Sequence, residues 1–267
     1  MTDTIIRAVD LARGDDASGL DRPASARRRV HPVLPTGIPV RVPAQVMERN
    51  RLISALKDQR ILDAYALLRS RVLHRVKQNR MVTLGVTSPS PRDGKSLTAT
   101  NLAISIAAGG SHPVLLVDAD VRRPSLASLF GLHVNLGLGD YLMDEADLDE
   151  IVLQPPINGL YMIPGHAASR LRPEGVTSDK VDGLMTELKQ YVPGALIIMD
   201  LPPALIGGDV VAFGPNLDGT LLVVANRRTH EEDMEKVMPM LEGANVMGTV
   251  LNFADQAASK NDYYSSR

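Results

Sequence analysis

The sequence predicts an α/β fold with a mainly parallel sheet, helices on both of its faces and a helical arm in front of it. From residue 81 onward, short apolar runs alternate with helical patterns. Runs such as Ala195–Met199 and Leu221–Ala225 are apolar throughout, which is typical of parallel strands that are buried on both faces. The length of 267 residues is sufficient for one large core of this kind.

Two segments precede the alternating region. Residues 1–45 are predicted to be a disordered tail, because they hold five prolines, the Arg27–Arg29 run and no aromatic residue. A short docking element is expected near Ile38–Val42. Residues 46–80 are predicted to be the helical arm, with helix over 46–79. Its apolar stripe steps by three and four residues and comprises Ile61, Tyr65, Leu68, Val72 and Val76.

The remaining elements follow in order along residues 81–254. Strands are expected at 81–87, 114–117, 160–163, 195–199, 220–225 and 246–251, because each is a short apolar run. Helices are expected at 96–108, 178–191 and 231–241, because apolar residues recur there at helical spacing. Residues 255–267 are polar and are expected to form a flexible tail.

Composition excludes several functional classes. The chain has no cysteine, so it has no disulfide, no thiolate metal site and no cysteine nucleophile. Its apolar runs are far shorter than the roughly 20 residues of a membrane span. The first ten residues resemble no secretory signal, because they contain acids and no apolar core segment. The six histidines lack metal-ligand spacing. A cytoplasmic location fits these observations.

The net charge of -2 hides an uneven distribution along the chain. Residues 46–80 carry a net charge of +6, whereas residues 81–267 carry -10. This polarity suggests that the basic arm faces an acidic surface, on another protein, a membrane or a second copy of the chain. In the alternative interpretation, the arm is a basic helix that faces solvent. Nucleic acid is not an expected partner, because no aromatic residue interleaves Arg27–Arg29 and the second half is acidic.

A phosphate-binding motif follows the first strand of the alternating region. Pro91-Arg92-Asp93-Gly94-Lys95-Ser96 ends in Gly-Lys-Ser and opens the 96–108 helix, as in a P-loop. Gly94 lets the backbone approach phosphate, Lys95 reaches the β- and γ-phosphates, and the Ser96 hydroxyl can bind Mg²⁺. Leu97 continues the predicted nucleotide-binding set. One departure is Pro89, which stands where the motif has its first glycine.

Acidic residues end two of the predicted strands. Asp118 and Asp120 follow the 114–117 strand, and Asp200 follows the 195–199 strand. Because ligands bind at the carboxyl ends of strands in an open α/β sheet, these acids are expected to converge on the P-loop. Ser96 and Asp200 are the predicted metal ligands. In the alternative interpretation, each Asp simply caps a turn or the next helix.

Together these motifs resemble a known family. Ser88–Ser96, Asn101–Ala103, Val117–Pro124 and Met199–Pro203 are similar to the bacterial tyrosine kinases of the CpsD/CapB type. These are cytoplasmic partners of capsule and exopolysaccharide chain-length proteins, and they belong to the P-loop ATPases that include MinD/ParA-like proteins. The latter carry a signature lysine five residues before the P-loop lysine. Ser90 stands there, which favours the kinase branch.

The resemblance implies roles for individual residues. It implies ATP and Mg²⁺ as cofactors and Lys95, Asp118 and Asp120 as catalytic residues. One of the two acids would help to hold Mg²⁺ and to activate the acceptor hydroxyl, and Asp118 joins Ser96 and Asp200 as an implied metal ligand. Asn252 matches a position where relatives place an asparagine against the base; in the alternative interpretation it is a plain asparagine at the end of the last strand. The implied phosphoacceptors are Tyr263 and Tyr264, in the C-terminal tail.

The resemblance also implies partners. The family uses the arm to contact the adjacent subunit of a ring, and Asp63 and Arg69 are the matching contacts here, although Ala66 replaces a family arginine. A homo-oligomer, ring-shaped in the family, is therefore expected. The expected hetero-partner is the cytoplasmic segment of a membrane polysaccharide co-polymerase, which would hold the chain at the inner face of the membrane.

Three functional hypotheses follow. The first is an Mg-ATP-dependent protein tyrosine autokinase that regulates exopolysaccharide or capsule polymerisation and export. The second is a non-catalytic ATP-binding scaffold of the same machinery, suggested by Pro89, Arg92 and Ala66. The third is a MinD/ParA-like ATPase.

Overall fold

The computed structural model describes residues 7–9, 37–166, 177–206 and 209–254. Within them, a nine-stranded sheet has the order β1-β9-β8-β3-β7-β4-β6-β5-β2. All neighbouring strands are parallel except β1 with β9 and β5 with β6. The strands are β1 (Arg7–Val9), β2 (Ile38–Pro39), β3 (Thr83–Thr87), β4 (Val114–Asp118), β5 (Leu153–Gln154), β6 (Leu160–Ile163), β7 (Leu196–Asp200), β8 (Gly219–Ala225) and β9 (Val246–Asn252).

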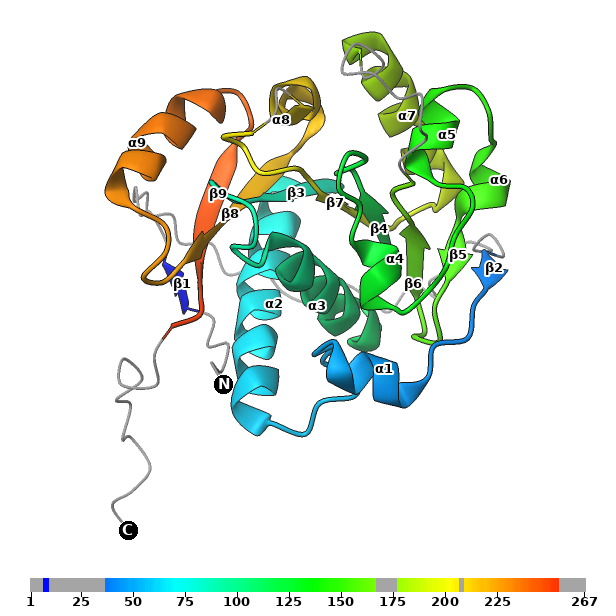
Figure 1. Ribbon diagram of the computed structural model, residues 1–267, viewed down its shortest axis with the longest axis horizontal. Helices are drawn as coiled ribbons and strands as arrows, with labels where there is room; N and C mark the ends of the chain where they lie inside the picture. Colours follow the sequence, from blue (N-terminus) through cyan, green and yellow to red (C-terminus); the bar gives the residue numbers. More distant parts are fainter. Residues whose placement is uncertain (1–6, 10–36, 167–176, 207–208, 255–267) are drawn as a thin grey trace, which may run out of the picture.

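Helices cover both faces of this sheet, so the predicted fold class is confirmed. On one face, α2 and α3 lie side by side (Figure 1), together with α1 and α4. The other five pack on the opposite face. The helices are α1 (Ala44–Arg49), α2 (Gln59–Asn79), α3 (Lys95–Ala108), α4 (Leu126–Leu129), α5 (Leu138–Leu142), α6 (Leu148–Ile151), α7 (Ser178–Tyr191), α8 (Asp209–Phe213) and α9 (Glu231–Met240).

The central strands are apolar throughout because each of their faces is covered. In β4, Leu116 packs into the core under α2 and α3, whereas its neighbours Leu115 and Val117 pack into the core under α7 and α9. All three are fully buried. In β7, Ile198 and Met199 divide between the two cores in the same way. The functional loops therefore rest on rigid strands that are buried on both sides.

The prediction of continuous helix over 46–79 is wrong. Helix α1 ends at Arg49, and α2 begins only at Gln59. Between them Arg51 adopts a left-handed conformation with φ 61, and the fully buried Leu52 fills the core. Asp58 then caps α2 by accepting a hydrogen bond from the Arg60 N–H at 3.0 Å. The predicted apolar stripe lies entirely in α2, and all of its members are buried.

Two parts of the segment predicted to be disordered are ordered. β1 pairs antiparallel with β9 at one edge of the sheet. At the opposite edge, the Ile38 N–H donates to the Val152 carbonyl at 2.8 Å and the Val40 N–H donates to Gln154 at 3.0 Å. The docking element expected near Ile38–Val42 is therefore confirmed. The other residues before 37 lie outside the described residues.

The strands and long helices predicted between 81 and 251 all occur, with small shifts at their ends. The short elements α4, α5, α6, α8 and β5 were not predicted, because they span only two to five residues and show no clear period. In the part of the chain that the structure describes, no helix has the length and apolar character of a membrane span.

Candidate active site

The P-loop joins the end of β3 to the start of α3. Gly94 is the N-cap of α3 and has φ 93, a left-handed conformation that favours glycine. A hydrogen bond within the loop stabilises its turn: the Ser90 N–H donates to the Asp93 carboxylate at 2.9 Å. The first turn of α3 therefore presents its N–H groups at the carboxyl edge of the sheet, which is where anions bind.

The predicted acids do converge on the P-loop lysine. The Lys95 ammonium lies 3.2 Å from a carboxylate oxygen of Asp120 and 3.2 Å from one of Asp200. It also donates to the Ser96 hydroxyl at 3.2 Å. The Lys95 side chain is 8% exposed and that of Asp200 is fully buried. Residues from α3, from β7 and from the loop after β4 thus meet at one point.

Asp118 combines a structural contact with an unpaired oxygen. One carboxylate oxygen accepts hydrogen bonds from the N–H groups of Ser125, at 2.8 Å, and Leu126, at 2.9 Å. The capping interpretation therefore describes this oxygen, because the contact fixes the start of α4. The other oxygen of Asp118 and one oxygen of Asp200 are buried without a hydrogen-bond partner among the described residues.

The titration of these groups reflects their burial. Burial, with the nearby Asp200 charge as a second cause, raises the pKa of Asp118 to about 7. Burial also raises the pKa of Asp200, although Lys95 opposes it. Burial disfavours the charged form of Lys95, but Asp200 and Asp120 outweigh it and raise its pKa. The site therefore holds more negative charge than one lysine neutralises, which suits a further cation.

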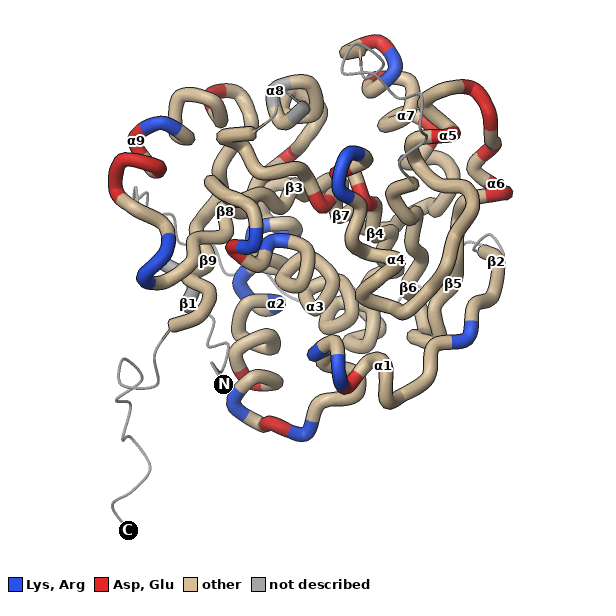
Figure 2. The backbone as a smooth tube through the Cα atoms, viewed as in Figure 1, with Lys and Arg blue, Asp and Glu red and all other residues tan. Residues whose placement is uncertain are grey.

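An open cavity of about 810 Å³ lies over the P-loop. Figure 2 shows acidic and basic segments meeting around the loops at the carboxyl ends of the central strands. Asn50, at the end of α1, also lines the cavity. Its P-loop lining is Pro91, Arg92, Gly94, Lys95, Ser96 and Leu97; beyond them lie Asp120, Arg122, Arg123, Pro202, Pro203 and Ile206. The volume suits a nucleotide-sized ligand.

The donors at this point fit a magnesium ion. Mg²⁺ is commonly held by one or two carboxylates, with phosphate oxygens and water completing its coordination. The two unpaired carboxylate oxygens, on Asp118 and Asp200, are costly to bury without a partner. The Ser96 hydroxyl accepts a hydrogen bond from the Lys95 ammonium, which also donates to the other oxygen of Asp200. No cluster of three or more acidic, histidine or cysteine side chains with metal-binding geometry occurs in the described ranges.

Other predicted residues occupy different surroundings. Asn252 is buried, and its amide donates to the Asp93 carbonyl at 2.9 Å. Arg69 donates to the Ser105 carbonyl of α3 at 3.0 Å, and Asp63 accepts from Gln59 at 2.8 Å, so both make contacts within this chain. The predicted acceptors Tyr263 and Tyr264 lie outside the described residues.

Three residues near the site were missed by the sequence analysis. Arg228 donates to the Arg92 carbonyl at 3.2 Å from the turn after β8. Gly165 follows β6 and lies against Asp118, since a Cβ added to it would stand 2.9 Å from the Asp118 Cγ. Asn50 donates to the Leu129 carbonyl at 2.8 Å. None of them belongs to a local motif, so the sequence held no signal for them.

Known proteins are similar in sequence to this chain over most of its length. The tyrosine-protein kinase YwqD of Bacillus subtilis is 28% identical over 212 residues, which are 77% of this chain and 86% of the relative. The tyrosine-protein kinase CpsD of Streptococcus pneumoniae serotype 4 is 28% identical over 185 residues, covering 68% and 80% of the two chains. The chain is therefore similar to bacterial tyrosine-protein kinases over more than two thirds of its length.

A solved structure supports the same relationship at the level of the fold. The chimerical protein CapA2B2 superposes with a TM-score of 0.71 at 23% identity, covering 84% of this chain and 96% of its own. No family model matches the chain. The resemblance to bacterial tyrosine kinases that the motifs indicated is therefore confirmed by relatives that match 77% and 68% of this chain.

Proposed function

We propose that this chain is an Mg-ATP-dependent protein tyrosine kinase. The observation that carries the proposal is the meeting of the P-loop Lys95 with Asp120 and Asp200, 3.2 Å from each, beneath an open cavity. Phosphoryl transfer needs charge neutralisation and in-line positioning more than covalent chemistry. A lysine on a phosphate loop, facing buried acids with unpaired oxygens, supplies both.

Each residue then has a physical role. Gly94, Ser96 and Leu97 would place the phosphates at the start of α3, and Lys95 would move from the acids to the β- and γ-phosphates. Ser96, Asp118 and Asp200 would hold Mg²⁺, which neutralises the phosphate charge. Asp120, which follows β4, is better placed than Asp118 to accept the proton of the tyrosine hydroxyl, because Asp120 lines the cavity.

The acceptor and the biological setting belong to the same proposal. Tyr263 and Tyr264 would be phosphorylated by another copy of the chain in a homo-oligomer, with the basic arm facing the neighbour. The setting is exopolysaccharide or capsule polymerisation and export, with the cytoplasmic segment of a membrane co-polymerase as partner. These points rest on the family resemblance and on the relatives, and the chain would work in the cytoplasm at the inner membrane face.

Intact mass spectrometry tests the proposal. The purified chain is incubated with ATP and Mg²⁺, alone and with the partner's cytoplasmic segment, beside Lys95→Met and the double variant Tyr263→Phe, Tyr264→Phe. Phosphate is expected on the wild type alone, at the two tail tyrosines. Wild type without phosphate but with ATP-dependent assembly would replace the kinase by the scaffold hypothesis. ATP hydrolysis stimulated by lipid or DNA, without phosphotyrosine, would favour the MinD/ParA-like hypothesis.

A further inference from the structure

We propose that Arg228 and Asn252 are positioning residues that hold two peptide groups of the P-loop in the orientation needed for phosphate binding. Neither side chain reaches the cavity lining. Each donates instead to a backbone carbonyl of the loop: Arg228 to Arg92 and Asn252 to Asp93. This inference rests on the proposed nucleotide binding, and it assigns Asn252 a role other than the base contact expected from the sequence.

The first contact comes from the end of β9. The Asn252 side chain is 2% exposed, and its amide nitrogen lies 2.9 Å from the Asp93 carbonyl oxygen. Its own oxygen accepts from the Phe253 N–H at 2.9 Å, which fixes the amide with the nitrogen towards the loop. A Cβ added to Gly94 would stand 1.9 Å from that nitrogen. Glycine at 94 is therefore what allows Asn252 to reach the loop.

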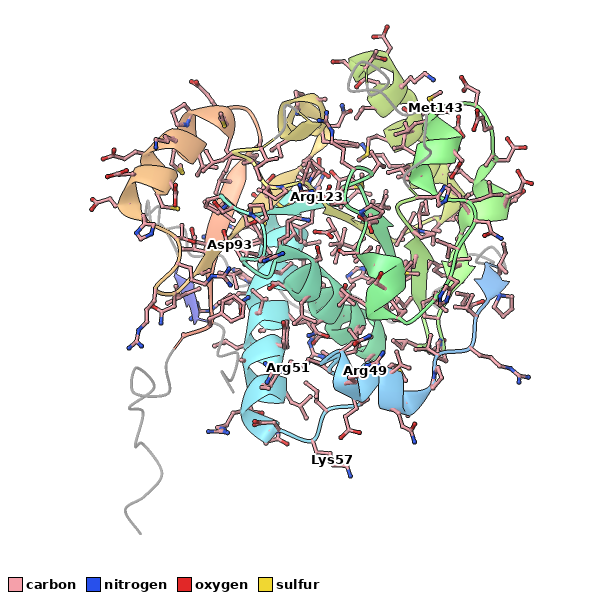
Figure 3. All side chains as sticks on the ribbon, viewed as in Figure 1. Arg49, Arg51, Lys57, Asp93, Arg123 and Met143 are labelled. Atoms are coloured by element: carbon pink, nitrogen blue, oxygen red, sulfur yellow. The ribbon has the colours of Figure 1, made fainter. Side chains whose placement is uncertain are left out.

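The second contact comes from the turn between β8 and α9. The Arg228 guanidinium lies 3.2 Å from the Arg92 carbonyl oxygen and 5.8 Å from the centre of the Phe253 ring. Phe253 follows Asn252, so the two contacts share one support. Asp93 is labelled in Figure 3, on the side of the molecule where β8 and β9 lie. The P-loop therefore contacts the turn after β8 and the end of β9, and neither strand carries a proposed catalytic residue.

Peptide geometry connects these contacts to phosphate binding. In a trans peptide the N–H points opposite to the C=O of the same unit. When Arg228 holds the Arg92 carbonyl, the Asp93 N–H points the other way, and when Asn252 holds the Asp93 carbonyl, so does the Gly94 N–H. Arg92 and Gly94 are both left-handed, with φ 66 and φ 93. Alternating conformations of this kind gather N–H groups into an anion-binding concavity.

Binding measurements with three ligands separate this role from a base contact. The full chain and the variants Arg228→Ala, Arg228→Lys and Asn252→Ala are titrated calorimetrically with Mg-ATP, Mg-GTP and Mg-tripolyphosphate. Lys236→Ala, at an exposed lysine of α9, is the matched control for charge. Arg228→Ala is expected to raise the Kd of all three ligands by about 10-fold, because one charge-assisted hydrogen bond is lost. The ATP-to-GTP affinity ratio should not change, and lysine should restore part of the affinity.

A second measurement reports on the peptide groups directly. In the nucleotide-free protein, the NMR amide resonances of Asp93 and Gly94 should shift or broaden in Arg228→Ala and match wild type in Lys236→Ala. Unchanged affinities in both Arg228→Ala and Asn252→Ala would overturn the proposal, as would a loss confined to ATP with tripolyphosphate unaffected. Because Arg228 is exposed, its variants test the idea even if Asn252→Ala fails to fold. A wild type that binds neither ATP nor tripolyphosphate would instead overturn the proposed function, and with it the positioning role of Arg228 and Asn252.

Discussion

Carboxylates stand at both ends of the central strands, but their surroundings are opposite. At the amino ends, one oxygen of Asp218 accepts hydrogen bonds from the N–H groups of Val82, at 2.7 Å, and Thr83, at 2.8 Å, and from the Thr83 hydroxyl at 3.0 Å. At the carboxyl ends, Asp118 and Asp200 are more deeply buried, and each has an oxygen without a hydrogen bond among the described residues.

The balance between burial and hydrogen bonding also shifts the pKa values of Asp218 and Asp118 in opposite directions. Burial would raise the pKa of Asp218, but the hydrogen bonds from Val82 and Thr83 outweigh it and lower that pKa. At Asp118 burial prevails and raises the pKa. A carboxylate oxygen that accepts several hydrogen bonds stabilises the fold, whereas one that is buried without a hydrogen bond is a candidate ligand for a cation. The following predictions test this contrast.

The largest effect is expected from Asp118→Asn. Asparagine keeps an oxygen for the Ser125 and Leu126 N–H groups but loses the charge that would hold Mg²⁺. Phosphorylation should fall by at least about 100-fold, whereas the free energy of unfolding without nucleotide should not fall, because a buried charge is removed. Phosphate incorporation and chemical denaturation at pH 8 measure the two. A variant that loses stability but keeps activity would break the contrast.

The opposite result is expected at the amino ends. Asp218→Ala should lower the free energy of unfolding by about 2 kcal/mol, because the Thr83 N–H and hydroxyl lose their acceptor in a partly buried site. Nucleotide affinity should stay near that of the wild type. Asp218→Asn, which keeps an acceptor oxygen, is the matched control and should lose less. Equal losses in the two variants would assign the effect to charge rather than to hydrogen bonding.

The pH dependence of that loss sharpens the comparison. Because the folded-state pKa of Asp218 lies below its unfolded value, near 4, the carboxylate stabilises the fold fully above that value. This stabilisation is lost as the pH falls through the folded pKa. The stability difference between wild type and Asp218→Ala should therefore be constant from pH 6 to 8 and shrink below pH 4. Urea denaturation at each pH would show it, and a constant difference down to pH 3 would contradict it.

The smallest effect concerns charge between copies of the chain. If the basic segment 46–80 faces the acidic remainder of a neighbour, raising NaCl from low to high concentration should weaken assembly severalfold, because salt screens exposed charges. Sedimentation velocity with Mg-ATP measures the oligomer fraction. An oligomer that is indifferent to salt would show that apolar contacts, rather than this complementarity, hold it together.

The arm shows how far a local pattern can be extended. The stripe from Ile61 to Val76 predicted α2 correctly, because its spacing matches a buried helical face. Extending the helix back to residue 46 was wrong, since residues 50–58 are held by distant partners. Asn101 of α3 accepts from the Ile53 N–H at 3.0 Å and donates to the Arg51 carbonyl at 3.0 Å. Those bonds replace the helical ones and allow the chain to turn there.

The sequence by itself determined the parallel sheet, the P-loop and the edge at which Lys95, Asp118, Asp120 and Asp200 meet. Strand period and motif spacing are local properties, and parallel strands bring their carboxyl ends to one edge. Only the tertiary structure decided that Asp118 caps α4 with one oxygen and leaves the other unpaired. It also decided that the Asn252 amide donates to the P-loop backbone. Its contact with Asp93 joins residues 159 positions apart, and that of Arg228 with Arg92 joins residues 136 apart. Such pairs are set by how strands are ordered in the sheet, which no local pattern in a single sequence specifies.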